Sequence, residues 1–159
     1  MTSADANKIL RELNNELTLI LERERGSSTF QASVGEDVES CRHDYDFAAT
    51  QKSIDSVEKD IRELKHKINV FNTTYVLDGF DITIDQALIL LPQLTSKKRK
   101  YEEMVTKMEK ERCHSYNNVV DYRYLNYDIR EVHRYLQKTT ELLTGLQREL
   151  DIVNNTVDM

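Results

Sequence analysis

Apolar residues recur three and four positions apart through long segments of the chain. In residues 47–71 one set falls on every seventh position, and a second set follows it three positions later. The two sets are Phe47, Ile54, Ile61 and Ile68, and Thr50, Val57, Leu64 and Phe71. This spacing places all of these side chains on one narrow face of an α-helix. It therefore predicts a long helix that packs on another helix.

The end of the chain repeats the pattern. Its two sets are Ile129, Leu136, Leu143, Leu150 and Val157, and Val132, Thr139, Leu146 and Val153. A shorter pattern near the beginning predicts a helix from about Ala4 to Arg25. Its expected inner face consists of Leu10, Leu13, Leu17, Ile20 and Leu21.

A further helix is expected to begin after Thr83, because Thr83 followed by Gln86 matches a capping box. In that motif the two side chains satisfy backbone donors of the first helical turn. An apolar stripe from Ile84 to Met108 extends this helix to about Arg112. Pro92 lies inside the stripe and removes one backbone hydrogen bond, which favours a kink over a stop because the stripe resumes in phase.

These patterns predict an all-α fold, an antiparallel bundle of about four long helices with coiled-coil-like packing. The expected helices are Ala4–Arg25, Asp44–Asn69, Thr83–Arg112 and Tyr127–Asn155, in a single domain over residues 1–159. Connectors of modest length favour helices that alternate in direction. A face left uncovered in such a bundle is an interface for a homo-oligomer.

Two connectors carry a weak strand signal. Phe30, Ala32 and Val34 alternate with polar residues, and so do Val120, Tyr122 and Tyr124. Short alternation is typical of a strand but is also found in loops. Either these two connectors pair as a short two-stranded β element, or both are loops.

Composition and charge narrow the functional classes. The 159 residues are 31% charged with a net charge of −6, which disfavours nucleic acid as a partner because that binding depends on clustered cations. We interpret the basic run Lys97–Lys100 as a solvated helix face beside nearby acids. The longest apolar run, Ala87–Leu91, is too short for a membrane span. Together with the absence of an export signal, this predicts a cytoplasmic protein whose Cys41 and Cys113 are free thiols.

Three segments resemble a known family. These are Lys67–Thr74 (KINVFNTT), Ile82–Leu88 (ITIDQAL) and Leu146–Asn154, in which LDIVN follows Glu149. They resemble a family of small bacterial helical proteins labelled septicolysin. The resemblance implies an all-helical oligomer with no known catalytic residue, and the label implies a membrane-active cytolysin. We disfavour lysis because the chain has no apolar hairpin and no helix that combines a basic face with a wide apolar one.

Cysteine and histidine residues suggest one candidate metal site. If residues 44–69 and 83–112 form an antiparallel hairpin, Cys41 and His43 fall opposite Cys113 and His114. Two sulfurs and two nitrogens are a tetrahedral zinc set. Adjacent residues diverge by about 100° on a helix, so Cys113 and His114 could ligate together only from a loop. We favour free thiols and solvated imidazoles, and keep zinc as the alternative.

No residue pattern indicates catalysis. His66 and His133 have no serine or carboxylate placed for nucleophilic chemistry. A di-iron bundle needs two inward Glu-x-x-His pairs, and only Glu63 with His66 has that spacing, off the apolar face. We therefore expect a protein that is not an enzyme.

Tyrosines gather in the connector before the last helix. Together with the Phe30 segment they form either a recognition surface or an end cap of the bundle, since tyrosine suits both positions. The candidate interaction residues are Phe30, Tyr116, Tyr122, Tyr124 and Tyr127. The favoured function is a self-associating helical interaction or scaffold protein with an unknown protein partner. The alternatives are a metal- or small-ligand-binding protein and a cytolysin.

Overall fold

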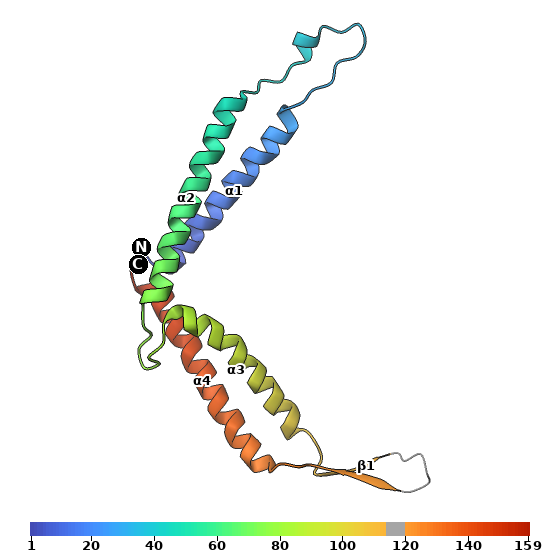
Figure 1. Ribbon diagram of the computed structural model, residues 1–159, viewed down its shortest axis with the longest axis vertical. Helices are drawn as coiled ribbons and strands as arrows, with labels where there is room; N and C mark the ends of the chain where they lie inside the picture. The colour runs from blue at the N-terminus through green and yellow to red at the C-terminus, as the bar shows by residue number, and fades with distance from the viewer. Residues whose placement is uncertain (114–119) are drawn as a thin grey trace. The chain divides into compact units, whose positions relative to one another are not determined.

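The computed structural model describes residues 1–113 and 120–159. It confirms the all-α fold with four long helices and a small two-stranded antiparallel sheet (Figure 1). The elements are α1 (Ser3–Ser27), a 3-10 turn η1 (Val38–Cys41), α2 (Phe47–Thr74), α3 (Ile84–Val105), β1 (Lys110–Cys113), β2 (Asp121–Tyr124) and α4 (Ile129–Thr156).

Backbone contacts divide the chain into two compact units. The first unit contains Met1–Asn72 and Val153–Met159, and the second contains Thr73–Ile152. The first therefore includes α1 and α2, and the second includes α3, the sheet and most of α4. The single domain over residues 1–159 stays a prediction.

In the first unit, α1 and α2 lie side by side (Figure 1). Thr2 caps α1 through a reciprocal capping box with Asp5. Asp46 caps α2, because its carboxylate accepts a 3.0 Å hydrogen bond from the Ala49 amide. The predicted face of α2 is confirmed where Ile54, Val57, Ile61, Leu64 and Phe71 are buried.

Two positions of the predicted faces are exposed in the first unit. Phe47 is 64% exposed and Leu21 is 43% exposed, so placing them on inner faces was wrong. Both line a shallow groove with Tyr45. Tyr45 lies against α1, where its hydroxyl donates a 2.8 Å hydrogen bond to Glu24.

The two ends of the chain meet in the first unit. An antiparallel bridge joins Thr2 to Asp158, and the Met159 amide donates to the Met1 carbonyl at 3.1 Å. The N-terminal ammonium also contacts the Asp158 carboxylate. Val153, at the end of α4, is buried in this unit.

The second unit pairs α3 with α4. The predicted face of α4 is buried at Val132, Thr139, Leu143, Leu146 and Leu150, and α3 contributes Ile84, Ala87 and Leu94. The predicted capping box of Thr83 and Gln86 is confirmed, and α3 continues through Pro92. Leu77, in the connector before α3, is also buried, and its amide bonds the Ile82 carbonyl at 2.9 Å.

Helix α3 ends seven residues earlier than predicted. The Thr106 hydroxyl bonds the Glu103 carbonyl at 2.8 Å, and the Lys107 amide bonds the Met104 carbonyl at 3.4 Å. These contacts satisfy carbonyls of the last helical turn. Met108 consequently lies outside the helix and is exposed, so its assignment to the α3 stripe was wrong.

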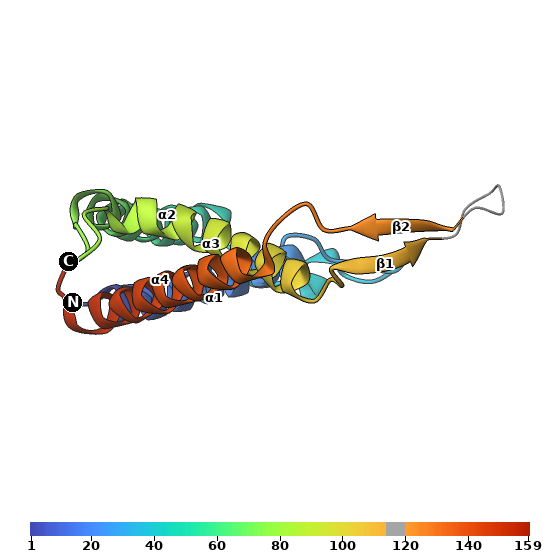
Figure 2. The same ribbon diagram turned by 90° about the horizontal axis from the view of Figure 1, so that it is seen from below.

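The sheet forms within one connector. Strands β1 and β2 pair antiparallel, with Lys110 opposite Tyr124 and Arg112 opposite Tyr122 (Figure 2). The prediction that the Val120–Tyr124 segment pairs with the Phe30 segment was therefore wrong. Only seven residues separate Cys113 from Asp121, whereas a strand at Phe30 would close a far longer loop at a higher entropic cost.

Candidate functional site

The β-hairpin has two chemically different faces. Directly opposite residues of an antiparallel pair project to the same side, and neighbours along a strand alternate. One side therefore carries Lys110, Arg112, Tyr122 and Tyr124, which we call the tyrosine face. It has two cations and no acid.

The tyrosines of this face are exposed and contact a lysine. Tyr122 is 46% exposed and Tyr124 is 62% exposed. The Lys110 ammonium lies 4.1 Å from the Tyr122 ring centroid and 5.5 Å from that of Tyr124. A cation over an aromatic ring is attracted by the electrons of the ring face. Lys110 thus lies over two large aromatic side chains at the surface.

The opposite face of the hairpin carries one ion pair and one further acid, Asp121. Arg123 Nη1 lies 3.7 Å from Glu111 Oε2. The other two residues of this face are Cys113 and Asp121. The Cys113 thiol donates a 3.9 Å hydrogen bond to the Glu111 carbonyl. Among the described residues of the hairpin, the two cations without an ion pair, Lys110 and Arg112, both lie on the tyrosine face.

The remaining predicted interaction residues have different surroundings. Tyr127 is half-buried, and its hydroxyl donates a 2.8 Å hydrogen bond to the Met104 carbonyl. Phe30 belongs to the first unit, where Arg42 stacks 5.2 Å from its ring centroid and His43 meets its edge. Tyr116 lies outside the described residues. The structure thus brings Tyr122 and Tyr124 together on one surface.

The predicted metal ligands are divided between the two units. Cys41 and His43 belong to the first unit and Cys113 to the second, while His114 lies outside the described residues. Both cysteines are free thiols. Cys41 donates a 3.7 Å hydrogen bond to Glu36. Within residues 1–113 and 120–159, no group of three or more histidine, cysteine, aspartate or glutamate side chains could hold a metal ion. The zinc site stays a prediction.

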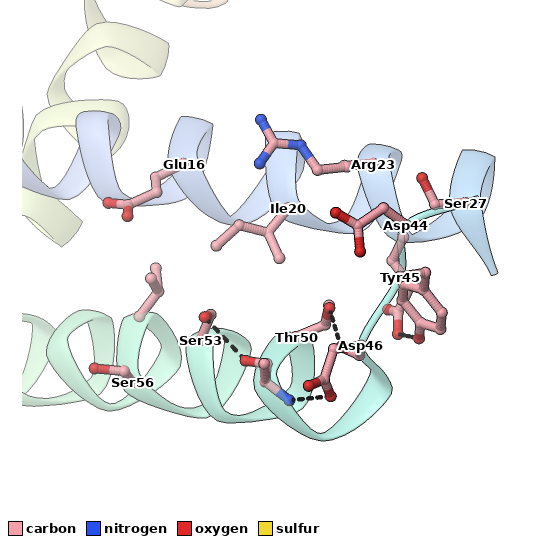
Figure 3. A pocket seen from close by; sticks show the side chains of 13 residues that line it. Glu16, Ile20, Arg23, Ser27, Asp44, Tyr45, Asp46, Thr50, Ser53 and Ser56 are labelled. Atoms are coloured by element: carbon pink, nitrogen blue, oxygen red, sulfur yellow. Dashed lines mark hydrogen bonds between the residues drawn. The ribbon is translucent and has the colours of Figure 1, made fainter.

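A groove of about 450 Å³ lies between α1 and the beginning of α2 (Figure 3). Small side chains on α2 leave room there, including Ala49, Ser53 and Ser56. Ile20 of α1 points into this space (Figure 3). Sequence reasoning missed this groove, although the run of small residues at the start of α2 was a usable signal.

Two of the four acids that line the groove, Glu24 and Asp46, have structural partners. Glu24 accepts hydrogen bonds from Tyr45 at 2.8 Å and from Gln51 at 2.7 Å. Asp46 caps α2 through the Ala49 amide. Burial, followed by the hydrogen bond to Glu24, raises the pKa of Tyr45 above its ordinary value. These contacts join α1 to α2 and arrange no nucleophile beside a base.

The apolar stripe of α1 is incompletely covered. We define the α1 stripe as Ile9, Leu10, Leu13, Leu17, Ile20 and Leu21. Every residue of α1 is described, and its buried residues are only Ser3 and Ala6. Four stripe residues are half-buried, while Ile9 and Leu21 are exposed. Helix α2 covers one side of this stripe and leaves apolar surface in water.

Searches of protein families, curated proteins and solved structures found no match to this chain. None of the described helices has the length and apolarity needed to cross a membrane. Two exposed surfaces are the candidates for function, the α1 stripe and the tyrosine face.

Proposed function

We propose that this chain is a self-associating helical interaction protein without enzymatic activity, and that copies associate through the α1 stripe. The observation that supports this most directly is that a regular amphipathic helix of 25 residues buries no large apolar side chain. Removing such side chains from water is favourable, by about 1.5–3 kcal/mol for each one fully buried. A second copy offers the same stripe and can cover it symmetrically.

Three features of the two units support the proposed scaffold role. Both helical pairs consist of long regular helices. In the groove, Glu24 accepts a hydrogen bond from Gln51 of the neighbouring helix and Asp46 caps α2. The exposed tyrosines offer contact area with little loss of side-chain freedom. This combination supports binding of protein surfaces more than chemistry on a substrate.

Sedimentation velocity at micromolar concentration tests the proposal. The wild-type chain should sediment above its single-chain mass of 18.7 kDa. Ile9→Ser combined with Leu21→Ser should return it to one chain, because both side chains are exposed members of the stripe. A wild-type mass of one chain would overturn the proposal.

Leu19→Ser supplies the matched control. Leu19 is 63% exposed, but it lies two residues from both Leu17 and Leu21, so it projects from the other side of α1. This variant removes a leucine that is more exposed than either Ile9 or Leu21, and it should retain the wild-type mass. Equal effects of the control and of the stripe variant would show that the association is not specific to the stripe.

The cytoplasmic setting and the septicolysin-like resemblance belong to the same proposal. The resemblance implies an oligomer, which agrees with association through α1. It also implies membrane activity, which a liposome-leakage assay separates from self-association. Leakage that persists in the Ile9→Ser and Leu21→Ser variant would favour the cytolysin over the scaffold.

A further inference from the structure

The connector before α2 is the chemical complement of the tyrosine face. We call residues 29–46 the acidic connector. It carries five acidic residues against one arginine, and so accounts for four of the six net negative charges of the chain. The acids are Glu36, Asp37, Glu39, Asp44 and Asp46, and the arginine is Arg42. All five acids are exposed.

The acidic connector also presents apolar side chains. Val34 is fully exposed and Val38 is 52% exposed. A turn joins the Glu36 amide to the Ser33 carbonyl at 3.1 Å, and the Glu36 carboxylate bonds the Ser33 amide at 2.8 Å. These contacts display Val34 at the tip of an ordered turn beside acidic side chains. Valine and tyrosine side chains pack well together, and carboxylates pair with lysine and arginine.

We propose that the acidic connector of one copy docks on the tyrosine face of the β-hairpin in a second copy. The carboxylates of the connector then face Lys110 and Arg112, and Val34 packs against the exposed rings of Tyr122 and Tyr124. The inference rests on the proposed self-association, because a complex joined through α1 carries more than one connector and hairpin, and this multivalency strengthens contacts between complexes.

An acidic partner fits this face better than a nucleic acid or an anionic membrane does. The tyrosine face carries only two cations, and Glu111 and Asp121 lie on the reverse of the same hairpin. A polyanion or an anionic bilayer would meet the net charge of −6 as well as this small cationic area.

The contact joins two different surfaces, so a pair of copies retains one free hairpin on the first copy and one free connector on the second. Such heterologous contacts build rings or open chains of copies. The expected result is assembly beyond the complex that α1 forms, increasing with concentration. It should disappear at about 1 M NaCl, where the Debye length is about 3 Å. The apolar α1 contact should persist there.

Charge reversal with mixing provides the decisive experiment. One variant, Lys110→Glu with Arg112→Glu, makes the tyrosine face acidic. The other, Asp37→Asn with Glu39→Lys and Asp44→Lys, makes the connector basic and keeps the Glu36 carboxylate that orders the turn. Asn at position 37 keeps the side-chain oxygen that accepts the Glu39 amide at the start of η1. Each variant alone should lose the salt-sensitive assembly, and an equimolar mixture of the two should regain it.

A matched control variant makes the same change in net charge but leaves the tyrosine face unaltered. Lys97→Glu with Lys100→Glu alters the net charge as much as the hairpin variant does, at exposed positions of α3. It should leave the assembly intact. Circular dichroism of every variant should match that of the wild-type chain, because the changes lie outside the buried helix faces.

The possible results separate this inference from the proposed function. A wild-type chain that is monomeric at all concentrations overturns both. A salt-resistant complex that never grows further overturns only the docking of the connector. Loss of assembly that mixing does not restore also overturns it, as does a salt-sensitive contact within one chain at unchanged mass. Binding of anionic vesicles or of RNA by the tyrosine face in place of assembly overturns it as well.

Discussion

The Tyr127 hydroxyl donates a 2.8 Å hydrogen bond to the carbonyl of Met104, which lies in the last turn of α3. The Leu125 amide bonds the Glu109 carbonyl at 3.2 Å nearby. These two contacts connect the residues that follow β2 to the residues that precede β1. They fix the base of the β-hairpin and thereby the position from which the tyrosine face projects.

Replacing Tyr127 with Phe removes this hydroxyl while keeping the ring. Because the side chain is half-buried, the Met104 carbonyl loses a partner that water replaces only in part. We expect the free energy of unfolding to fall by about 1 kcal/mol. Urea denaturation measures this change. Tyr135→Phe is the control, because Tyr135 is 53% exposed, and an equal loss there would assign the effect to tyrosine hydroxyls in general.

A pair of leucines on α4 tests the buried face of the second unit. Leu146 is fully buried, so Leu146→Ala leaves a cavity and should lower the free energy of unfolding by about 2–5 kcal/mol. Leu142 is exposed on the same helix, and Leu142→Ala should cost about 0.5 kcal/mol or less. Denaturant titration of the two variants should reveal this difference, and similar costs would contradict the burial of the α4 face.

Substitution by alanine should change the stability of the protein in opposite directions at two glycines. A Cβ on Gly145 would meet Phe80 Cζ at 3.5 Å, an ordinary van der Waals contact, so Gly145→Ala should stabilise α4 by up to about 1 kcal/mol. Gly79 has a φ of +76°, and Gly79→Ala should destabilise by about 1–2 kcal/mol. Thermal unfolding of both variants checks the signs. Destabilisation by Gly145→Ala would indicate that the helix requires glycine there.

The helices could be predicted from the sequence because their signal is long and redundant. The face of α2 repeats over seven turns, so a single exposed residue such as Phe47 does not change the assignment. The capping box of Thr83 and Gln86 located the start of α3 for a local reason, since both partners lie within one turn. Tertiary contacts seldom override local patterns of this kind, so the helix assignment from sequence holds.

The tyrosine face could be predicted only in part. Tyr122 and Tyr124 stood out by residue type, but their partner strand consists of Lys110, Glu111, Arg112 and Cys113, which has no apolar alternation. Its pairing depends on closing a short loop, and composition does not report that. The division into two units also depends on contacts between distant residues. The α1 stripe was recognised as an inner face, while its incomplete burial required coordinates.

Acid titration of a helix cap gives the last prediction. Asp128 lies just before α4, and its carboxylate accepts a 2.8 Å hydrogen bond from the Arg130 amide. This backbone bond, with the charge of Arg130 as a smaller contribution, lowers the pKa of Asp128 below its ordinary value of 3.8. The folded chain thus favours the ionised form. The resulting stabilisation is fully present above about pH 3.8 and is lost as the pH falls through the lower pKa of the folded state.

The variant Asp128→Asn isolates this titration, because asparagine is also a good N-cap and cannot ionise. At pH 7 the wild-type chain should have the higher melting temperature, since a carboxylate interacts favourably with the positive end of the helix dipole. Below about pH 3.8 the difference should shrink toward zero as the wild-type carboxyl group takes up its proton. Melting temperatures of both chains between pH 7 and pH 2 measure this convergence. Because both chains share every other titrating group, a difference that stays constant over that range would show that Asp128 acts through its hydrogen-bond geometry and not through its charge.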